Sequence, residues 1–124
     1  MRTPTQILLL SILLSGCWNS VENQASKLGA REFTAETWAT ATDLQRGEMT
    51  ASLLSKHDVT NFHRKEVVAL LGAPTGYYDY DTNPAYFVGP TTVESVYGKG
   101  YMLVFETDKY NGKVDRVFFL PAVE

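Results

Sequence analysis

The sequence predicts a single α+β domain in two layers, with two helices packed on an antiparallel meander sheet of three or four strands. Three observations predict this class. Residues 35–56 and 62–71 have helical spacing, four segments of strand length follow them, and an Asn-Gly pair separates the last two segments. Helices followed by a run of consecutive strands, without regular alternation of the two, are typical of α+β domains.

The first predicted helix spans residues 35–56, and Thr34 precedes it as an N-cap. Its buried side is defined by residues at three- and four-residue spacing: Trp38, Ala41, Gln45, Met49 and Leu53. Gly47 lies within this pattern and costs about 1 kcal/mol relative to alanine in a helix. We therefore expect a kink or a break at Gly47.

The second predicted helix follows a turn at residues 57–61 and begins the segment FHRKEVVALLGAP, residues 62–74. Val67, Leu70 and Leu71 have the spacing of a single apolar face. The glycine and the proline directly after this face end the helix, because glycine favours the helix terminus and proline cannot continue it.

Four segments are predicted strands: residues 77–80, 85–88, 101–107 and 113–120. Their aromatic and β-branched residues suit a pleated surface. Residues 81–84 predict the first turn, Asn111-Gly112 predicts a hairpin between the last two strands, and Pro121 ends the sheet.

One face of the predicted sheet is a candidate contact surface. Alternation along the last two strands assigns Met102, Val104, Val117 and Phe119 to a single apolar face. Helices on the opposite face leave such a set uncovered, and an uncovered apolar face favours protein binding. On this hypothesis, Val104→Asp abolishes partner binding and leaves the fold intact. Cover by the N-terminal segment or by the loop 89–100 is the open alternative.

Residues 1–16 predict a signal peptide. Arg2 precedes the apolar run Ile7–Leu14, whose eight residues are too few to cross a bilayer. The four residues Leu14–Cys17, Leu-Ser-Gly-Cys, resemble the lipobox of bacterial lipoproteins. This resemblance implies cleavage before Cys17 and lipidation of its sulfur through a thioether, with palmitate among the acyl chains.

The same resemblance predicts a location. Trp18 follows the cysteine, where an aspartate would retain such a protein at the inner membrane, so we expect the bacterial outer membrane with the domain facing the periplasm. Two or more acyl chains anchor a protein stably. Residues 17–34 are polar and predict the lipidated cysteine and a flexible tether, which leaves residues 35–124 as the folded domain.

The sequence shows none of the patterns that indicate an enzyme or a metal site. A Gly-x-Ser-x-Gly elbow and a phosphate-binding loop are both absent. His57 and His63 do not have a metal-ligand spacing and are predicted to be solvated loop residues. Residues 79–83 begin like a calcium loop, but Pro84 and Pro90 stand where its glycine and glutamate belong. We predict a non-enzymatic protein without cofactor or metal.

The net charge of the protein limits the classes of partner that it can bind. The net charge is −3, and it becomes −4 once Arg2 leaves with the signal peptide. No basic patch is present, which argues against a nucleic-acid partner and against electrostatic adhesion to anionic lipid.

The segment from residue 60 to residue 120 resembles the SmpA/OmlA family of small outer-membrane lipoproteins. A charged pair before an apolar helix, a Gly-x-Pro stop and a Phe strand, Gly turn and Val strand carry the resemblance. The matching positions are Arg64, Lys65, Glu66, Val67, Leu70, Leu71, Gly72, Pro74, Phe105, Gly112 and Val114. This sequence departs from the family at Asn61-Phe62-His63, where Gly-Met-Ser/Thr is usual.

The resemblance implies two helices on a three-stranded sheet, a fold shared with β-lactamase inhibitory proteins. It also implies an envelope protein that binds another protein, in outer-membrane assembly or in envelope integrity. The alternative function is a periplasmic inhibitor or ligand-binding module that uses the exposed face of its sheet.

The lipobox makes a direct prediction. Replacement of the sulfur-bearing residue in Cys17→Ala removes the acceptor atom, so we expect a chain without any lipid. Mass spectrometry of the mature amino terminus measures this. Acylation that persists in the variant would contradict the lipobox interpretation.

Overall fold

The computed structural model describes residues 20–124. The predicted signal peptide, the predicted lipidation site Cys17 and Trp18 lie outside the described residues. The helices of this part are α2 (Val21–Ser26), α3 (Ala35–Thr40), α4 (Asp43–Lys56) and α5 (Arg64–Leu71), with the 3-10 turn η1 (Val59–Asn61) before α5. The strands are β1 (Gly76–Tyr77), β2 (Pro84–Val88), β3 (Glu94–Ser95), β4 (Gly98–Lys99), β5 (Tyr101–Thr107) and β6 (Val114–Leu120).

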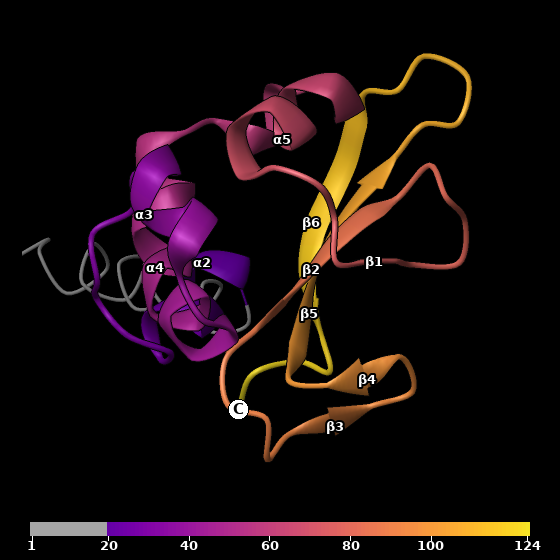
Figure 1. The fold of residues 1–124 in the computed structure, drawn as a ribbon. Coiled ribbons are helices and arrows are strands. Elements are labelled where there is room, and N and C mark those ends of the chain that lie inside the picture. The colour runs from indigo at the N-terminus through magenta and orange to yellow at the C-terminus, as the bar shows by residue number, and fades with distance from the viewer. Residues whose placement is uncertain (1–19) are drawn as a thin grey trace, which may run out of the picture.

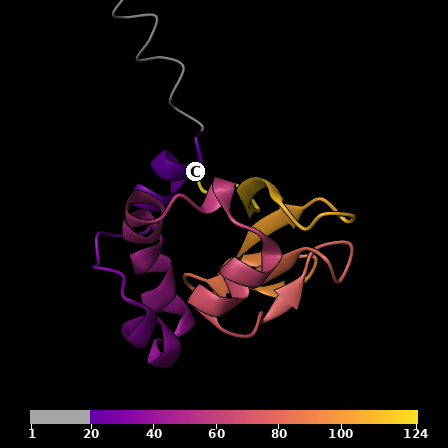
Figure 2. The same cartoon turned by 90° about the horizontal axis from the view of Figure 1, so that it is seen from above.

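The main sheet is antiparallel with strand order β1-β2-β5-β6, and β3 and β4 form a separate hairpin between β2 and β5. Helices α2, α3 and α4 lie on one side of the sheet (Figures 1 and 2). The β3–β4 hairpin and the loop between β1 and β2 project from the other side (Figure 1). The predicted α+β class is confirmed.

The predicted helix 35–56 is two helices that meet at Ala41 and Thr42, and the expected break at Gly47 is wrong. Ala41 is extended, with φ −77° and ψ 151°. The Thr42 hydroxyl accepts from the backbone N–H of Gln45 at 3.2 Å, and the Gln45 side chain accepts from the N–H of Thr42 at 3.0 Å. This reciprocal capping box starts α4 and satisfies two backbone donors that the helix itself leaves unpaired.

Gly47 has a packing role inside α4. A Cβ at this position would lie 2.7 Å from the backbone of Gly89, just after β2. The helix therefore crosses the end of β2 at a distance that only a glycine permits.

Residues 20–34 are part of the folded domain, and their prediction as a flexible tether is wrong. Ala25 in α2 is 0% exposed and Phe33 is 1% exposed. The Phe33 backbone N–H donates to Ser52 Oγ at 2.9 Å, and its carbonyl accepts from Lys56 Nζ at 2.9 Å. The Val123 N–H donates to Gln24 Oε1 at 2.8 Å, which joins the two ends of the described chain. Residues 20–34 therefore pack as part of the domain.

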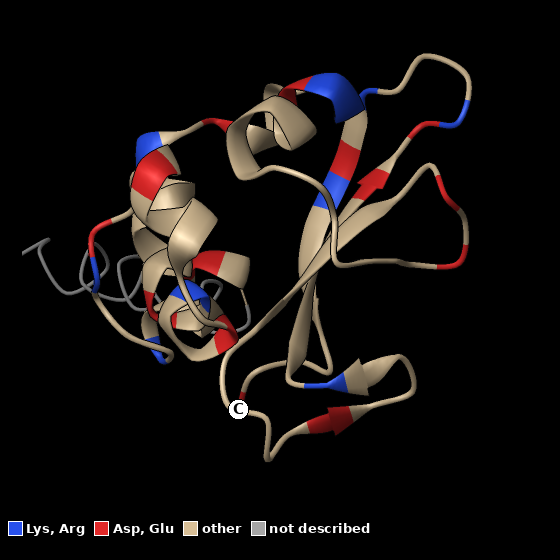
Figure 3. Cartoon of the chain, viewed as in Figure 1, with Lys and Arg blue, Asp and Glu red and all other residues tan. Residues whose placement is uncertain are grey.

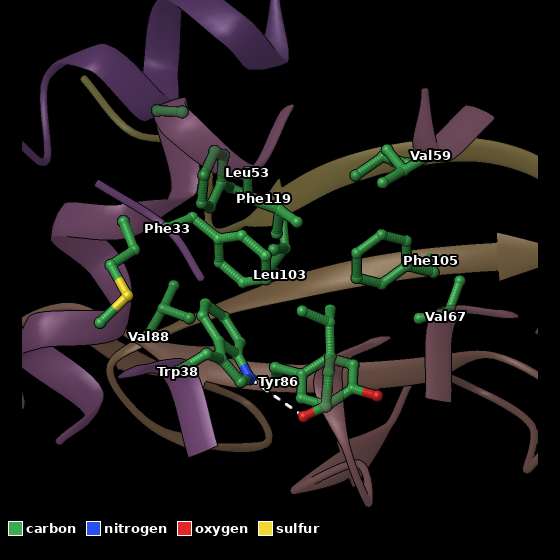
Figure 4. Close-up of a cluster of buried hydrophobic side chains, with 14 of the residues drawn as sticks. Phe33, Trp38, Leu53, Val59, Val67, Tyr86, Val88, Leu103, Phe105 and Phe119 are labelled. Atoms are coloured by element: carbon green, nitrogen blue, oxygen red, sulfur yellow. Dashed lines mark hydrogen bonds between the residues drawn. The ribbon is translucent and has the colours of Figure 1, made fainter. Parts of the chain in front are cut away.

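The main core lies between the helices and the inner face of the sheet (Figure 4). Trp38 of α3 is fully buried, and its Nε1–H donates to the Leu71 carbonyl at 3.0 Å. Tyr86 of β2 donates from its hydroxyl to the Gly72 carbonyl at 2.7 Å. The two rings pack edge to face, with centroids 6.0 Å apart. One aromatic pair therefore joins α3, β2 and the end of α5.

The last hairpin and the first strand differ from prediction in detail. β1 contains residues 76 and 77, and the rest of the predicted strand 77–80 belongs to the following loop. Asn111-Gly112 is part of a longer loop in which the Asp108 carboxylate accepts from the N–H groups of Tyr110 and Asn111. These two bonds hold the pKa of Asp108 below its ordinary value.

Removal of the Phe33 ring tests whether the N-terminal segment belongs to the core. Phe33 packs edge to face on Trp38 at 5.8 Å and on His57 at 5.6 Å. We expect Phe33→Ala to lower the free energy of unfolding by about 3–5 kcal/mol, as for other buried aromatic residues. Urea denaturation measures the loss. The exposed helix position Glu36→Ala is the control, with an expected change within about 0.5 kcal/mol, and equal stability of the two variants would contradict the assignment.

Candidate protein-contact surface

The structure separates the four residues that the sequence assigns to one contact face. In the β5–β6 register, Met102 is opposite Leu120 and Leu103 is opposite Phe119. Directly opposed residues of two strands point to the same face. Met102 and Val104 therefore face away from the helices with Phe118 and Leu120, whereas Val117 and Phe119 lie in the main core. The prediction that the four residues share a face is wrong.

The helix-free side of the sheet, here called the outer face, has a small core of its own. Ala85, Met102 and Val104 are buried there, with Val104 0% exposed. Half-buried side chains pack around these three residues: Tyr78, Phe87, Phe118 and Leu120. Val104 is thus a core residue, and its burial argues against the expectation that Val104→Asp leaves the fold intact.

Two projecting segments cover the outer face. Tyr78 comes from the loop after β1, and its ring packs edge to face on Phe118 at 5.2 Å. The β3–β4 hairpin lies directly on Phe87, since a Cβ at Gly98 would be 3.0 Å from that ring. The sequence left open whether the N-terminal segment or the loop 89–100 covers this face. The loop 89–100 covers part of it, and the N-terminal segment packs with the helices instead.

A clasp made of Tyr78, Asp79 and Tyr97 joins the two projecting segments. The Tyr97 hydroxyl donates to Asp79 Oδ1 at 3.2 Å, and the rings of Tyr97 and Tyr78 have centroids 6.1 Å apart. Asp79 has a φ of 61°, a left-handed conformation that aspartate tolerates better than most residues. Partial desolvation and the hydrogen bond to Asp79 raise the pKa of Tyr97 above its ordinary value.

Exposed apolar side chains gather on these same segments. Within the described residues, six large hydrophobic side chains are exposed, and three of them belong to the loop after β1 and to the β3–β4 hairpin. We call these three the outer rim: Tyr80, Val96 and Tyr97. Tyr80 is 69% exposed and Val96, at the hairpin tip, is 90% exposed. Tyrosine is enriched in protein interfaces because its ring is apolar and its hydroxyl can hydrogen-bond.

A groove adjoins the outer rim at the hairpin. Its volume is about 390 Å³, and it is lined by Glu94, Ser95 and Val96 of the hairpin region and by Leu120 and Pro121 at the end of β6. The apolar part of this lining extends the rim toward the C-terminal end of the sheet.

Acidic residues lie on the same two segments as the outer rim. Asp79 and Asp81 belong to the loop after β1, and Glu94 belongs to β3 (Figure 3). All three are exposed. Lys99 is opposite Glu94 in the register of the hairpin backbone, without an ion pair between them, and is the one basic residue in segments 77–82 and 94–99. The rim therefore combines aromatic rings with a local excess of negative charge.

The two histidines and the turn at residues 79–83, whose sequence patterns resemble metal sites, do not form such a site in the described residues. His63 is exposed at the N-terminus of α5, as predicted, but His57 is half-buried, with its ring edge-on to Phe33 and Phe62. Asn83 donates to the Tyr78 carbonyl and accepts from the Thr107 N–H, which fixes the predicted turn. Residues 20–124 contain no group of three or more His, Cys, Asp or Glu side chains that could hold a metal ion.

A second cavity, of about 240 Å³, lies beside the N-terminus of α5 and includes His63, Arg64 and Tyr110. The Arg64 guanidinium in its wall donates to the carbonyls of Thr82 and Asp108 and to Thr107 Oγ1. Arg64 therefore holds together the loops at one end of the sheet.

Comparisons of the chain with family models, with curated proteins and with solved structures gave no match. Among the helices of the described part, none combines the length and the apolar character needed to cross a bilayer.

We expect substitution by aspartate to affect stability very differently at Val104 and at Tyr80, because Val104 is buried and Tyr80 is exposed. Val104→Asp places a carboxylate among apolar side chains without a partner, so we expect a loss of more than about 4 kcal/mol of stability. Tyr80→Asp changes an exposed side chain, and we expect a shift within about 0.5 kcal/mol. Thermal unfolding followed by circular dichroism compares them. A well-folded Val104→Asp protein would show that the outer face is not a core.

Proposed function

We propose that this chain is a lipid-anchored protein of the bacterial outer membrane whose domain faces the periplasm, has no enzymatic activity, and binds another envelope protein through the outer rim. The observation that supports this function most directly is the clustering of exposed Tyr80, Val96 and Tyr97 on two projecting segments. Exposed aromatic residues that gather in one place favour a protein contact more than the same residues scattered over a surface.

The clasp supports the rim as a binding surface because it limits the motion of the two segments. Tyr97 is fixed by its hydrogen bond to Asp79 and by its contact with Tyr78, and Tyr78 is held by Phe118. A rim that is ordered before the partner arrives loses less conformational entropy on binding.

The folded N-terminal segment supports a short link between the domain and its proposed anchor. Only three residue steps separate Cys17 from residue 20, where the described domain begins, and an extended chain covers at most about 11 Å in three steps. Helix α2 packs with the helices, while the outer rim is on the other side of the sheet (Figure 1). An acylated Cys17 would thus hold the domain near the membrane and leave the rim accessible.

Membership in the SmpA/OmlA family is part of the proposal and rests on residues 60–120. It suggests a role in outer-membrane protein assembly or in envelope integrity. The alternative, an inhibitor of a periplasmic enzyme, is favoured by one observation: Val96 projects at the tip of a hairpin next to a groove, a shape that can enter a cleft of another protein.

Site-specific photo-cross-linking in the bacterial envelope tests the proposal. A photoreactive residue at position 80 or 96 should cross-link the full lipidated chain to one protein, since both positions are exposed on the outer rim. The same residue at position 40, exposed on α3, is the matched control. A cross-linked membrane complex would support a subunit function, and a soluble enzyme would support the inhibitor. Equal products from position 40, or none from the rim, would contradict the proposed surface.

A further inference from the structure

The outer face already binds one arginine side chain of its own, and this contact shows which chemistry the surface suits. Arg116 of β6 donates from Nε to Glu106 Oε1 at 2.6 Å, and its guanidinium carbon lies 4.1 Å from the centroid of the Phe118 ring. Glu106 is opposite Arg116 in the register and follows Met102 and Val104 on the same face. The guanidinium thus binds both a carboxylate and an aromatic ring.

The segments of the outer rim also present carboxylates and aromatic rings, but no guanidinium lies between them. Within the described residues, the Asp81 and Glu94 carboxylates form no ion pair and accept no hydrogen bond. The neighbouring ring of Tyr80 is 69% exposed, and Tyr97 is 39% exposed. Exposed carboxylates beside exposed aromatic faces are the complement of an arginine side chain, which pairs through its fork of N–H donors and stacks through its plane.

We propose that the partner of the outer rim is a protein that presents arginine side chains to Asp81, Glu94 and the tyrosine rings. This inference rests on the proposed function and specifies the chemistry of the partner. Opposite charges steer the two surfaces together. The acidic rim repels phosphate groups and anionic lipid, so the complementary surface is a basic region of a protein.

Arginine rather than lysine follows from the geometry of the surface. A guanidinium is planar and weakly hydrated, so it stacks on a ring while its N–H groups bind a carboxylate. A lysine ammonium is compact and strongly hydrated, and it gives up more hydration to reach the same ring. Substitution of arginine by lysine in the partner should therefore weaken the contact although the charge is unchanged.

A peptide titration tests the inference. The mature lipidated protein, held in nanodiscs of neutral phosphatidylcholine, is titrated with a blocked hexapeptide of alternating arginine and serine at low ionic strength. The same peptide with lysine, or with uncharged citrulline, in place of arginine supplies the comparison. We expect the arginine peptide to bind at least about tenfold more tightly than the citrulline peptide and several-fold more tightly than the lysine peptide. Equal affinity for arginine and lysine would overturn the inference.

Matched variants locate the binding site. We expect Asp81→Asn combined with Glu94→Gln, and separately Tyr80→Leu, to weaken the arginine peptide about tenfold. Glu22→Gln combined with Glu36→Gln removes the same charge from exposed positions on the helices, and Tyr110→Leu removes an even more exposed tyrosine from another loop. Both controls should bind as the unchanged protein does. Equal weakening in the controls would show a diffuse charge effect and overturn the inference.

The cross-linking experiment separates this inference from the function on which it rests. A partner captured from position 80 or 96 through a segment without arginine overturns the arginine inference and leaves the outer rim as a protein contact. Failure of every rim position to cross-link overturns both.

Discussion

The edge-to-face pair of Trp38 and Tyr86 is the contact on which the rest of the domain depends. Both rings are fully buried, and their polar atoms donate to two successive carbonyls, those of Leu71 and Gly72, at the end of α5. A buried indole N–H or phenol O–H without a partner is costly. These two hydrogen bonds therefore hold α3 and β2 against the C-terminal end of α5. The Arg46 guanidinium, 4.8 Å from the Trp38 ring, closes the pair from the side of α4.

The two faces of the sheet are therefore covered by different kinds of structure. All the long helices pack on the inner face, so the outer face is stabilised by short segments of the sheet itself. Tyr78 and the β3–β4 hairpin supply that cover, and the clasp holds them in place. Short covering segments cannot bury all their side chains. The aromatic and acidic residues left at their edges form the outer rim, which links the packing of the domain to its proposed binding function.

Parts of the fold followed from the sequence because their causes are local. The end of α5 at Leu71, before Gly72, depends on one glycine with a φ of 83°, and the strands 101–107 and 113–120 depend on their own composition. The division between α3 and α4 also had a local signal, the Thr-x-x-Gln pattern of Thr42 and Gln45, which the helical spacing of the surrounding residues concealed. Gly47 had a distant cause instead, its contact with Gly89.

The sequence by itself determined the helix–helix–sheet order, the antiparallel class and the absence of recognisable catalytic motifs. Only the tertiary structure decided that residues 20–34 are folded, because the burial of Phe33 depends on Trp38 and on α4. The tertiary structure likewise placed Met102 and Val104 on one face and Val117 and Phe119 on the other. Alternation within a strand fixes two sets of side chains, but the register between strands decides which sets share a face.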